Sequence, residues 1–200
     1  SNTTDRDTGQ IDVSPLAEIP LTDVVQVGKE RAAFTRLSLC DENGQPCSIF
    51  EQGSRMYIQC EVTTQIRLAC MSVGISIKDR TNVFVHGKHS IQHGIRTGTL
   101  QPGDKVGFQF SFSLELAPGA YSMDIGIIDI HANLDEGVPV SMIDSCLERI
   151  CLGDGFTSFQ VAPRSHYTML QLPFFGLTDI SGDCLVLPAD PSKPDHLPRG

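Results

Sequence analysis

Residues 107–130, GFQFSFSLELAPGAYSMDIGIIDI, carry hydrogen-bonding side chains at regular intervals within apolar segments. In the first half, Gln109, Ser111, Ser113 and Glu115 alternate with phenylalanine and leucine. Successive side chains of a β-strand point to opposite faces, so one row faces a core and the other forms a polar surface. Amide and hydroxyl groups donate and accept hydrogen bonds, which is the chemistry that recognises sugar hydroxyls.

Polar residues at matching positions of neighbouring strands widen this surface into a shallow trough. Solvated faces are usually rich in Lys, Glu and Thr, whereas this face is dominated by Ser, Gln and Gly. We expect the hydroxyls of a sugar to bond to Gln59, Ser72, Ser76, Gln109, Ser111 and Ser113. Tyr57 or His86 would stack on a sugar CH face, and Arg67, Lys88 or Arg96 would meet a carboxylate or phosphate. The alternative is that this surface is an ordinary solvated face without a ligand. A shift of one residue in strand register would turn each of these sets of side chains to the opposite face of its sheet.

Other reactive residues do not form an obvious catalytic or metal site. His86, His89 and His93 straddle the end of a predicted strand and a loop, so we expect no metal there. Asp124 and Asp129 fall on opposite faces of one predicted strand, which excludes a carboxylate pair. Asp129 is expected to form a turn. Tyr121 follows APGA, and we expect its hydroxyl to bond back to the backbone at a corner of a sandwich, in preference to a ligand contact.

Common enzyme motifs are missing from the sequence. It contains no GxSxG, GxxxxGK[ST], GxGxxG or HExxH pattern. A sugar-modifying enzyme would need a convergent acid and nucleophile. We therefore expect a protein that is not an enzyme and that uses no cofactor.

Composition narrows the classes of partner. The 200 residues carry a formal net charge of -9 with a pI near 5.0, which argues against nucleic acid or an anionic membrane surface. The seven cysteines form no CxxC pair, as is usual in reduced, intracellular proteins. No apolar run approaches the ~20 residues of a membrane span, and no signal-peptide pattern opens the chain. We expect a cytoplasmic protein without direct membrane insertion.

Alternation and turn residues predict an all-β antiparallel sandwich of about eight strands with one short helix. The expected strands are residues 32–40, 55–64, 69–79, 81–87, 104–116, 119–130 and 156–161. Residues 141–153, SMIDSCLERICLG, have helical spacing of apolar residues and end at Gly153. Residues 1–27 are expected to form a linker or docking arm, and the proline-rich residues 188–200 a disordered tail.

An ordered set of segments resembles a known family. The segments are GKERAAFTRLSLCDENGQP (28–46), FEQGSRMYIQCEV (50–62), VGISIKDRTNVFVHGKHS (73–90), LQPGDKVGFQFSFSLELAPGAYSMDIGIIDI (100–130) and FTSFQVAP (156–163). Together they resemble the C-terminal domain of Wzt-type proteins, the ATP-binding subunits of ABC transporters that export O-antigen polysaccharide. The pattern of the family does not assign the site residues one by one.

The resemblance implies an immunoglobulin-like sandwich over residues 28–163 that binds the exported glycan at its modified non-reducing end, without catalysis. It implies an ATPase domain and a transmembrane transporter subunit as partners, and a cytoplasmic place at the inner membrane. The resemblance also implies a homodimer formed by exchange of C-terminal strands, and the apolar residues 164–187 would be the exchanged strand or would pack on their own protomer. The alternative function is a dimerisation or docking module with no glycan site of its own.

Overall fold

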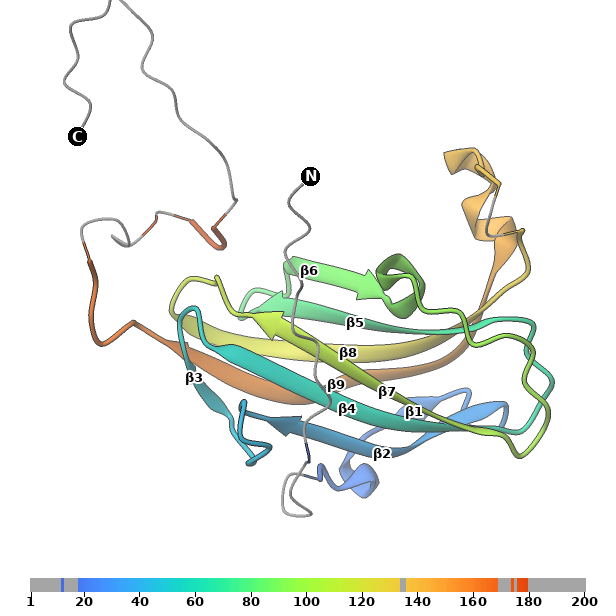
Figure 1. The fold of residues 1–200 in the computed structure, drawn as a ribbon, viewed down its shortest axis with the longest axis horizontal. Helices are drawn as coiled ribbons and strands as arrows, with labels where there is room; N and C mark the ends of the chain where they lie inside the picture. The colour runs from blue at the N-terminus through green and yellow to red at the C-terminus, as the bar shows by residue number, and fades with distance from the viewer. Residues whose placement is uncertain (1–11, 13–17, 134–135, 169–173, 175, 180–200) are drawn as a thin grey trace, which may run out of the picture.

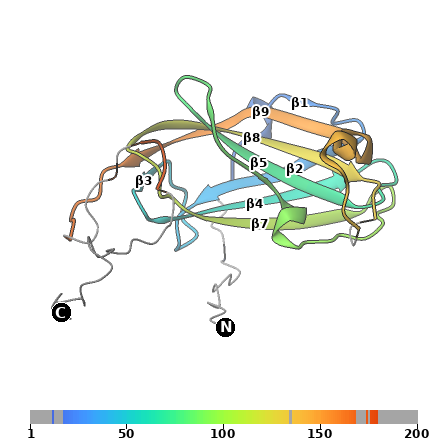
Figure 2. The ribbon, with the colours of Figure 1, turned by 90° about the horizontal axis from the view of Figure 1, so that it is seen from above.

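Two β-sheets pack face to face in the computed structural model, which describes residue 12 and residues 18–133, 136–168, 174 and 176–179 (Figures 1 and 2). The three-stranded sheet has the order β2 (Ala32–Cys40), β4 (Arg55–Thr64) and β7 (Lys105–Ser113). The six-stranded sheet has the order β1 (Gln26–Val27), β9 (Leu147–Ala162), β8 (Gly119–Ile130), β5 (Met71–Asp79) and β6 (Phe84–His89). Strand β3 (Ile49–Glu51) pairs in parallel with β9, and all other pairs are antiparallel. The predicted all-β sandwich is confirmed.

The core lies between the sheets and follows the predicted alternation. Met56, Ile58 and Val62 of β4 are fully buried, and they face Val73 and its apolar neighbours on the six-stranded sheet. Burying each such side chain stabilises the fold by roughly 1.5–3 kcal/mol, which explains why the alternating segments form strands. The side chains between them point outward from the sandwich and form the outer face of each sheet.

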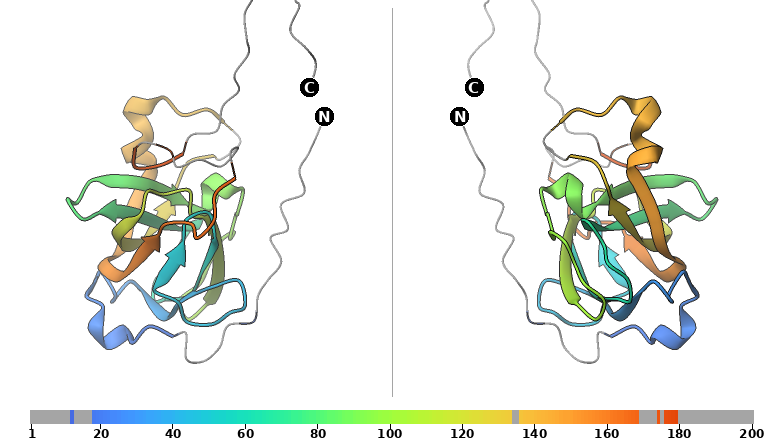
Figure 3. Two further views of the ribbon diagram at one scale, coloured as in Figure 1. Left: turned by 90° about the vertical axis from the view of Figure 1, so that its left-hand side faces the viewer. Right: turned by 90° about the vertical axis from the view of Figure 1, so that its right-hand side faces the viewer.

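The predicted helix over residues 141–153 is wrong in its second half. Residues Val140–Cys146 form a short 3₁₀-helix, η4, which projects from the sandwich (Figure 3), and β9 begins at Leu147. Ile127 pairs with Cys151 while Ile128 pairs with Arg149, so Ile150 is the extra residue of a β-bulge. The bulge lets Ile150 and Cys151 both turn inward, and this pair of adjacent apolar residues imitates helical spacing.

Three polar residues suspected of chemistry have structural contacts instead. The Tyr121 hydroxyl donates to the carbonyl of Ala117 at 2.7 Å, which confirms the predicted corner tyrosine. The Asp129 carboxylate accepts from the backbone N–H groups of Ala69 and Cys70 at 2.9 and 2.8 Å. Asp124, on the outer face of the six-stranded sheet, pairs with Lys78 and accepts from the N–H of Gly155 at 2.8 Å.

The sandwich begins before the predicted end of the N-terminal arm, and described residues after β9 contact it. Residues 18–27, assigned to an arm from sequence, include the 3₁₀-helix η2 (Leu21–Asp23) and β1, and Val24 lies in the core. After β9, Arg164 pairs with Glu115, and residues 177–179 bond to the backbone of residues 115–117. Residues 169–173, 175 and 180–187 of the predicted exchanged strand, and the predicted tail at 188–200, lie outside the described residues.

The cysteines of the described part of the chain, Cys40, Cys47, Cys60, Cys70, Cys146 and Cys151, are free thiols. Burial raises the pKa of Cys60 to about 12, which keeps this thiol protonated and unreactive. No helix within the described ranges has the length and apolar character needed to cross a membrane.

Candidate functional site

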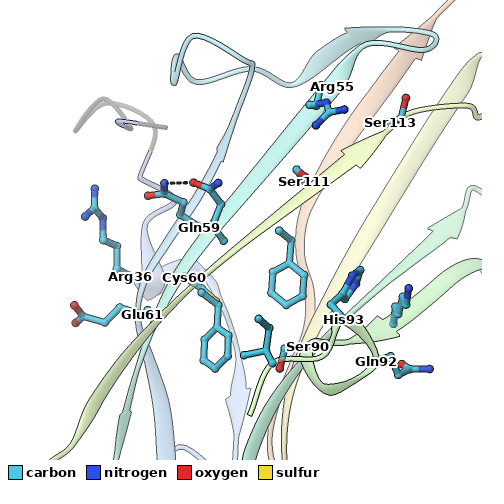
Figure 4. A pocket seen from close by; sticks show the side chains of 16 residues that line it. Arg36, Arg55, Gln59, Cys60, Glu61, Ser90, Gln92, His93, Ser111 and Ser113 are labelled. Carbon is cyan, nitrogen blue, oxygen red and sulfur yellow. Dashed lines mark hydrogen bonds between the residues drawn. The ribbon is translucent and has the colours of Figure 1, made fainter. Parts of the chain in front are cut away.

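A groove of about 1100 Å³ runs over the outer face of β4 and β7 and around the free side of β7 (Figure 4). Its floor is built from alternate residues of the two strands. These residues are Arg55, Gln59, Glu61, Gly107, Gln109, Ser111 and Ser113. The alternation that buries the phenylalanines of β7 is therefore what presents its amide and hydroxyl groups to the groove.

Gln59 and Gln109 form the centre of this floor. They are register partners on β4 and β7, and the Nε2 of Gln59 donates to the Oε1 of Gln109 at 2.8 Å. Ser111 and Ser113 follow on β7, opposite Tyr57 and Arg55. The bond between the two amides fixes both side chains, so their polar atoms are held in place before any ligand arrives.

The wall beside this floor comes from the 3₁₀-helix η3 (Ser90–His93) and Ile95. None of these residues was predicted from the sequence to bind a sugar. Ser90 is buried, and its hydroxyl lies 3.0 Å from that of Ser72 and accepts from the N–H of Val73 at 3.1 Å. The Gln92 side chain accepts from the N–H of His89 at 2.7 Å, and Gly94 ends η3 at a positive φ of 82°. A fixed wall of Gln92, His93 and Ile95 therefore offers both polar and apolar contacts.

Aromatic rings link this wall to β7. The rings of His93 and Phe110 meet edge to face at 6.1 Å, and those of His86 and Phe112 do so at 5.4 Å. Burial, and then the nearby charge of Lys88, lower the pKa of His86, so its ring is neutral at pH 7. His86 thus supports Phe112 beneath the groove and does not line it.

Charged side chains lie along the groove (Figure 4). Near one end of the β4 floor, Arg36 pairs with Glu18 at 2.9 Å, and Glu61 lies 3.7 Å from Lys105. Arg55 lies at the other end of this floor, opposite Ser113, and Lys88 of β6 lines the groove as well.

The structure brings five of the predicted site residues into this groove: Gln59, Lys88, Gln109, Ser111 and Ser113. Tyr57 is 7% exposed and presents no open ring. Ser72 is fully buried beneath η3, and Ser76 lies on the outer face of the opposite sheet. Arg67 and Arg96 are exposed in loops and, like His86, do not line the groove. Strand phase separates inner from outer positions, but it does not say which of two sheets a strand joins, so the predicted trough combined two opposite faces.

Among the described residues that line the groove, Glu61 is the one carboxylate, whereas glycoside hydrolysis generally uses two. No group of three His, Cys, Asp or Glu residues in the described chain is arranged to hold a metal ion. His86 and His89 occupy opposite faces of β6, which keeps their rings apart.

Comparison with solved structures supports the fold. The crystal structure of a Wzt C-terminal domain is 16% identical, with a TM-score of 0.59, and the match covers 89% of this chain and 93% of that chain. A CARDB domain from Pyrococcus furiosus (10% identity, TM-score 0.34, 66% of this chain and 90% of that chain) is too distant to bear on function. The same holds for a β-glucosidase from Listeria innocua (8% identity, TM-score 0.33, 70% and 16%).

Sequence comparison identifies the family. No curated protein matches the chain. The sequence model of the Wzt C-terminal domain matches residues 23–178, which is most of the chain and includes every strand of the sandwich. The match confirms the resemblance found in the sequence. The chain belongs to the family of Wzt C-terminal domains.

Proposed function

We propose that this domain binds an O-antigen polysaccharide, without catalysis, in the groove over β4 and β7, and that it binds the modified non-reducing end of the chain. The observation that carries the proposal is the fixed pair of amides, Gln59 and Gln109, at the centre of an open groove with Ser111 and Ser113 beside them. Amides and hydroxyls offer donors and acceptors to the many hydroxyls of a sugar.

The size and depth of the groove fit a polymer end. Arg55 and Glu61 mark its length on β4 and are six residues apart, or about 20 Å along a strand. The exposed side chains of His93 and Ile95 lie at the wall, where a sugar CH face would contact them. Because an open groove buries little apolar area, the dissociation constant should be on the order of micromolar to millimolar.

In this proposal, the domain couples finished chains to export. Its partners would be the ATPase domain and the transmembrane subunit of an ABC transporter, and its location the cytoplasmic side of the inner membrane. The support for these partners is membership of the Wzt family. A homodimer formed by exchange of residues 164–187 belongs to the same proposal, because a partner's copy of residues 177–179 could make the backbone bonds to residues 115–117 equally well.

Calorimetric titration with the O-polysaccharide of the source strain tests the proposal. Native chains and chains trimmed at the non-reducing end should be compared at equal concentration. We expect saturable binding of native chains and at least a tenfold weaker response with trimmed chains. Equal binding would show that internal repeats are recognised. No binding by a folded protein would leave the alternative, a dimerisation or docking module without a glycan site.

A further inference from the structure

The ring of His89 lies where β6 ends and the groove wall begins. Its register partner on β5 is Gly74, and a Cβ atom there would lie 2.4–2.7 Å from three atoms of the ring, so the ring packs directly on the backbone of β5. The backbone N–H of His89 donates to the Oε1 of Gln92 at 2.7 Å. Because Gln92 lines the groove (Figure 4), His89 connects the six-stranded sheet to the groove.

Two buried serines also attach η3 to β5. The hydroxyl of Ser72 accepts from the N–H of Ile91 at 3.1 Å, that of Ser90 accepts from the N–H of Val73 at 3.1 Å, and the two hydroxyls lie 3.0 Å apart. Hydroxyl and backbone groups keep the same charge from about pH 5 to pH 8, whereas an imidazole changes its charge in this range. Of these attachments, the His89 ring is therefore the one that responds to pH.

The surroundings of the ring favour its neutral form. Its Nδ1 is buried and has no hydrogen-bond partner among the described residues. Burial lowers the pKa of His89 from its ordinary value of 6.5, so the ring is neutral at pH 7. Protonation would turn Nδ1 into a donor, and this donor would have no acceptor while the ring stays on Gly74.

The charged side chains of β5 and β8 interact elsewhere. Lys78 pairs with Asp124 across the two strands. Asp79 accepts hydrogen bonds within the turn that follows β5, and Asp129 accepts from backbone N–H groups of the segment that precedes it. Each of these carboxylates thus has a partner other than His89.

The other ionisable groups near the ring are on β6 and η3. His86 and Lys88 belong to the opposite face of β6, where the ring of His86 meets that of Phe112 at 5.4 Å. His93 lines the groove, and its ring meets that of Phe110 at 6.1 Å. His93 is therefore the histidine from which any effect of His89 on glycan binding must be distinguished.

We propose that His89 is a positioning residue for the groove, and that its neutral ring, packed on Gly74, holds η3 so that Gln92 and His93 are placed to contact the glycan. This inference rests on the proposed function. Protonation draws the ring toward water, shifts the start of η3 and weakens glycan binding in acid. The contribution of the packed ring is complete above about pH 6.5 and is lost as the pH falls through the lowered folded-state value.

Calorimetric titration with the native O-polysaccharide of the source strain at two pH values tests the inference. Wild type should bind roughly threefold to tenfold more weakly at about pH 5 than at about pH 7.5, because the ring gains its charge between them. His89→Phe keeps a ring that is never charged and should bind equally at both pH values, as should the smaller His89→Asn if phenylalanine does not fit. Ionisable groups of the polysaccharide would affect all proteins alike, so the affinity of wild type is compared with that of each variant at the same pH.

Control variants separate His89 from the rest of the wall. Ser72→Ala removes an attachment that does not titrate and should weaken binding by the same factor at both pH values, whereas His93→Gln should retain the loss in acid. Gly74→Ala displaces the His89 ring at any pH and should weaken binding already at about pH 7.5. Gly126→Ala should not, because a Cβ there would meet its nearest atom at 3.5 Å.

The outcomes distinguish this inference from the proposed function. Wild-type affinity that does not change with pH would overturn the inference while the proposed function stands. The same holds for a loss in acid that persists in both His89 variants or that disappears in His93→Gln. Native chains that bind the folded wild type at neither pH would overturn the proposed function and, with it, this inference.

Discussion

Gln59 and Gln109 lie directly opposite each other on β4 and β7, and the amide of one donates to the amide of the other at 2.8 Å. The two residues are 50 positions apart in the sequence and meet only because the strands pair in this register. The pair occupies the outer face of the three-stranded sheet, away from the core. It is the part of the groove on which the proposed function depends most.

Removal of one amide should weaken glycan binding. Gln109→Ala deletes hydrogen-bonding groups from the centre of the groove and should raise the dissociation constant by roughly threefold to tenfold. Ser76→Ala is the control, because Ser76 carries a polar side chain on the outer face of the opposite sheet. Calorimetric titration of both variants with native polysaccharide checks the prediction. Equal effects of the two substitutions would mean that the groove is not the site.

Gly74 makes room for the histidine that precedes η3. A Cβ atom at position 74 would lie 2.4–2.7 Å from ring atoms of His89, so Gly74→Ala must displace this ring and strain the start of the groove wall. We expect a loss of roughly 1–3 kcal/mol in the free energy of unfolding, measured with urea.

The neighbouring glycine provides the control for this prediction. Gly126 is the register partner of Gly74, but a Cβ there would meet its nearest atom at an ordinary 3.5 Å. Gly126→Ala should therefore have little effect, and His89→Ala added to Gly74→Ala should restore stability. A Gly74→Ala variant as stable as Gly126→Ala would contradict the packing described for His89.

The Lys78–Asp124 pair should contribute to stability at neutral pH and lose its contribution in acid. The two side chains are 15% and 9% exposed. Asp124 also accepts from the N–H of Gly155, in a second irregularity of β9 that lies between Gly153 and Thr157. Burial alone would raise the pKa of Asp124, but the hydrogen bonds from Lys78 and Gly155 outweigh it and lower the pKa. Asp124→Asn should cost about 3 kcal/mol at pH 7, the lower end of the range for buried pairs, since Lys78 keeps some contact with water.

The pH dependence of this cost has a defined sign. A carboxyl group with a lowered folded-state pKa stabilises the fold above its unfolded pKa of about 3.9, and this contribution is lost as the pH falls through the folded value. The difference between wild type and Asp124→Asn should therefore be constant from pH 7 to 5 and shrink below about pH 4. Urea titrations across this range test it, with Arg31→Met as a control that breaks the exposed pair with Glu148. A difference that stays constant down to pH 3 would contradict the assignment.

The proposed strand exchange predicts a dimer. Light scattering after size exclusion should give twice the 21.8 kDa mass of one chain. A chain that ends at residue 163 lacks the contacts of residues 177–179 with residues 115–117 and should be monomeric. A monomeric full chain would show that these contacts are made within one protomer.

Much of the sandwich could be predicted from sequence because its strands alternate cleanly. The segments of β4 and β7 were placed at 55–64 and 104–116, and their inner and outer residues were assigned correctly. The alternation also led to the wrong prediction that Ser72 and Ser76 share a surface with Gln59 and Gln109. Both serines belong to β5 of the other sheet, and local periodicity does not reveal which distant strands pair.

The wall of the groove was missed for a different reason. Ser90, Gln92 and His93 lie in a short 3₁₀-helix whose sequence has no hydrophobic period. Gln92 three residues after His89, followed by Gly94, was the available signal of a capped helical turn. In residues 141–153 the error was a false helical signal. The bulge at Ile150 gives part of β9 an apparent helical spacing of apolar residues.

The central claim is that the outer face of β4 and β7 is the glycan site. The most direct test is a chemical-shift titration of the isotope-labelled chain with native O-polysaccharide, which reports on every backbone and side-chain amide at once. We predict saturable shifts of the Gln59 and Gln109 side-chain amides and of the backbone at Ser111, Ser113 and Gln92, with none at Ser76 or Ser122 on the opposite sheet. Saturable shifts confined to the opposite sheet or to η4, with the groove unchanged, would contradict the account.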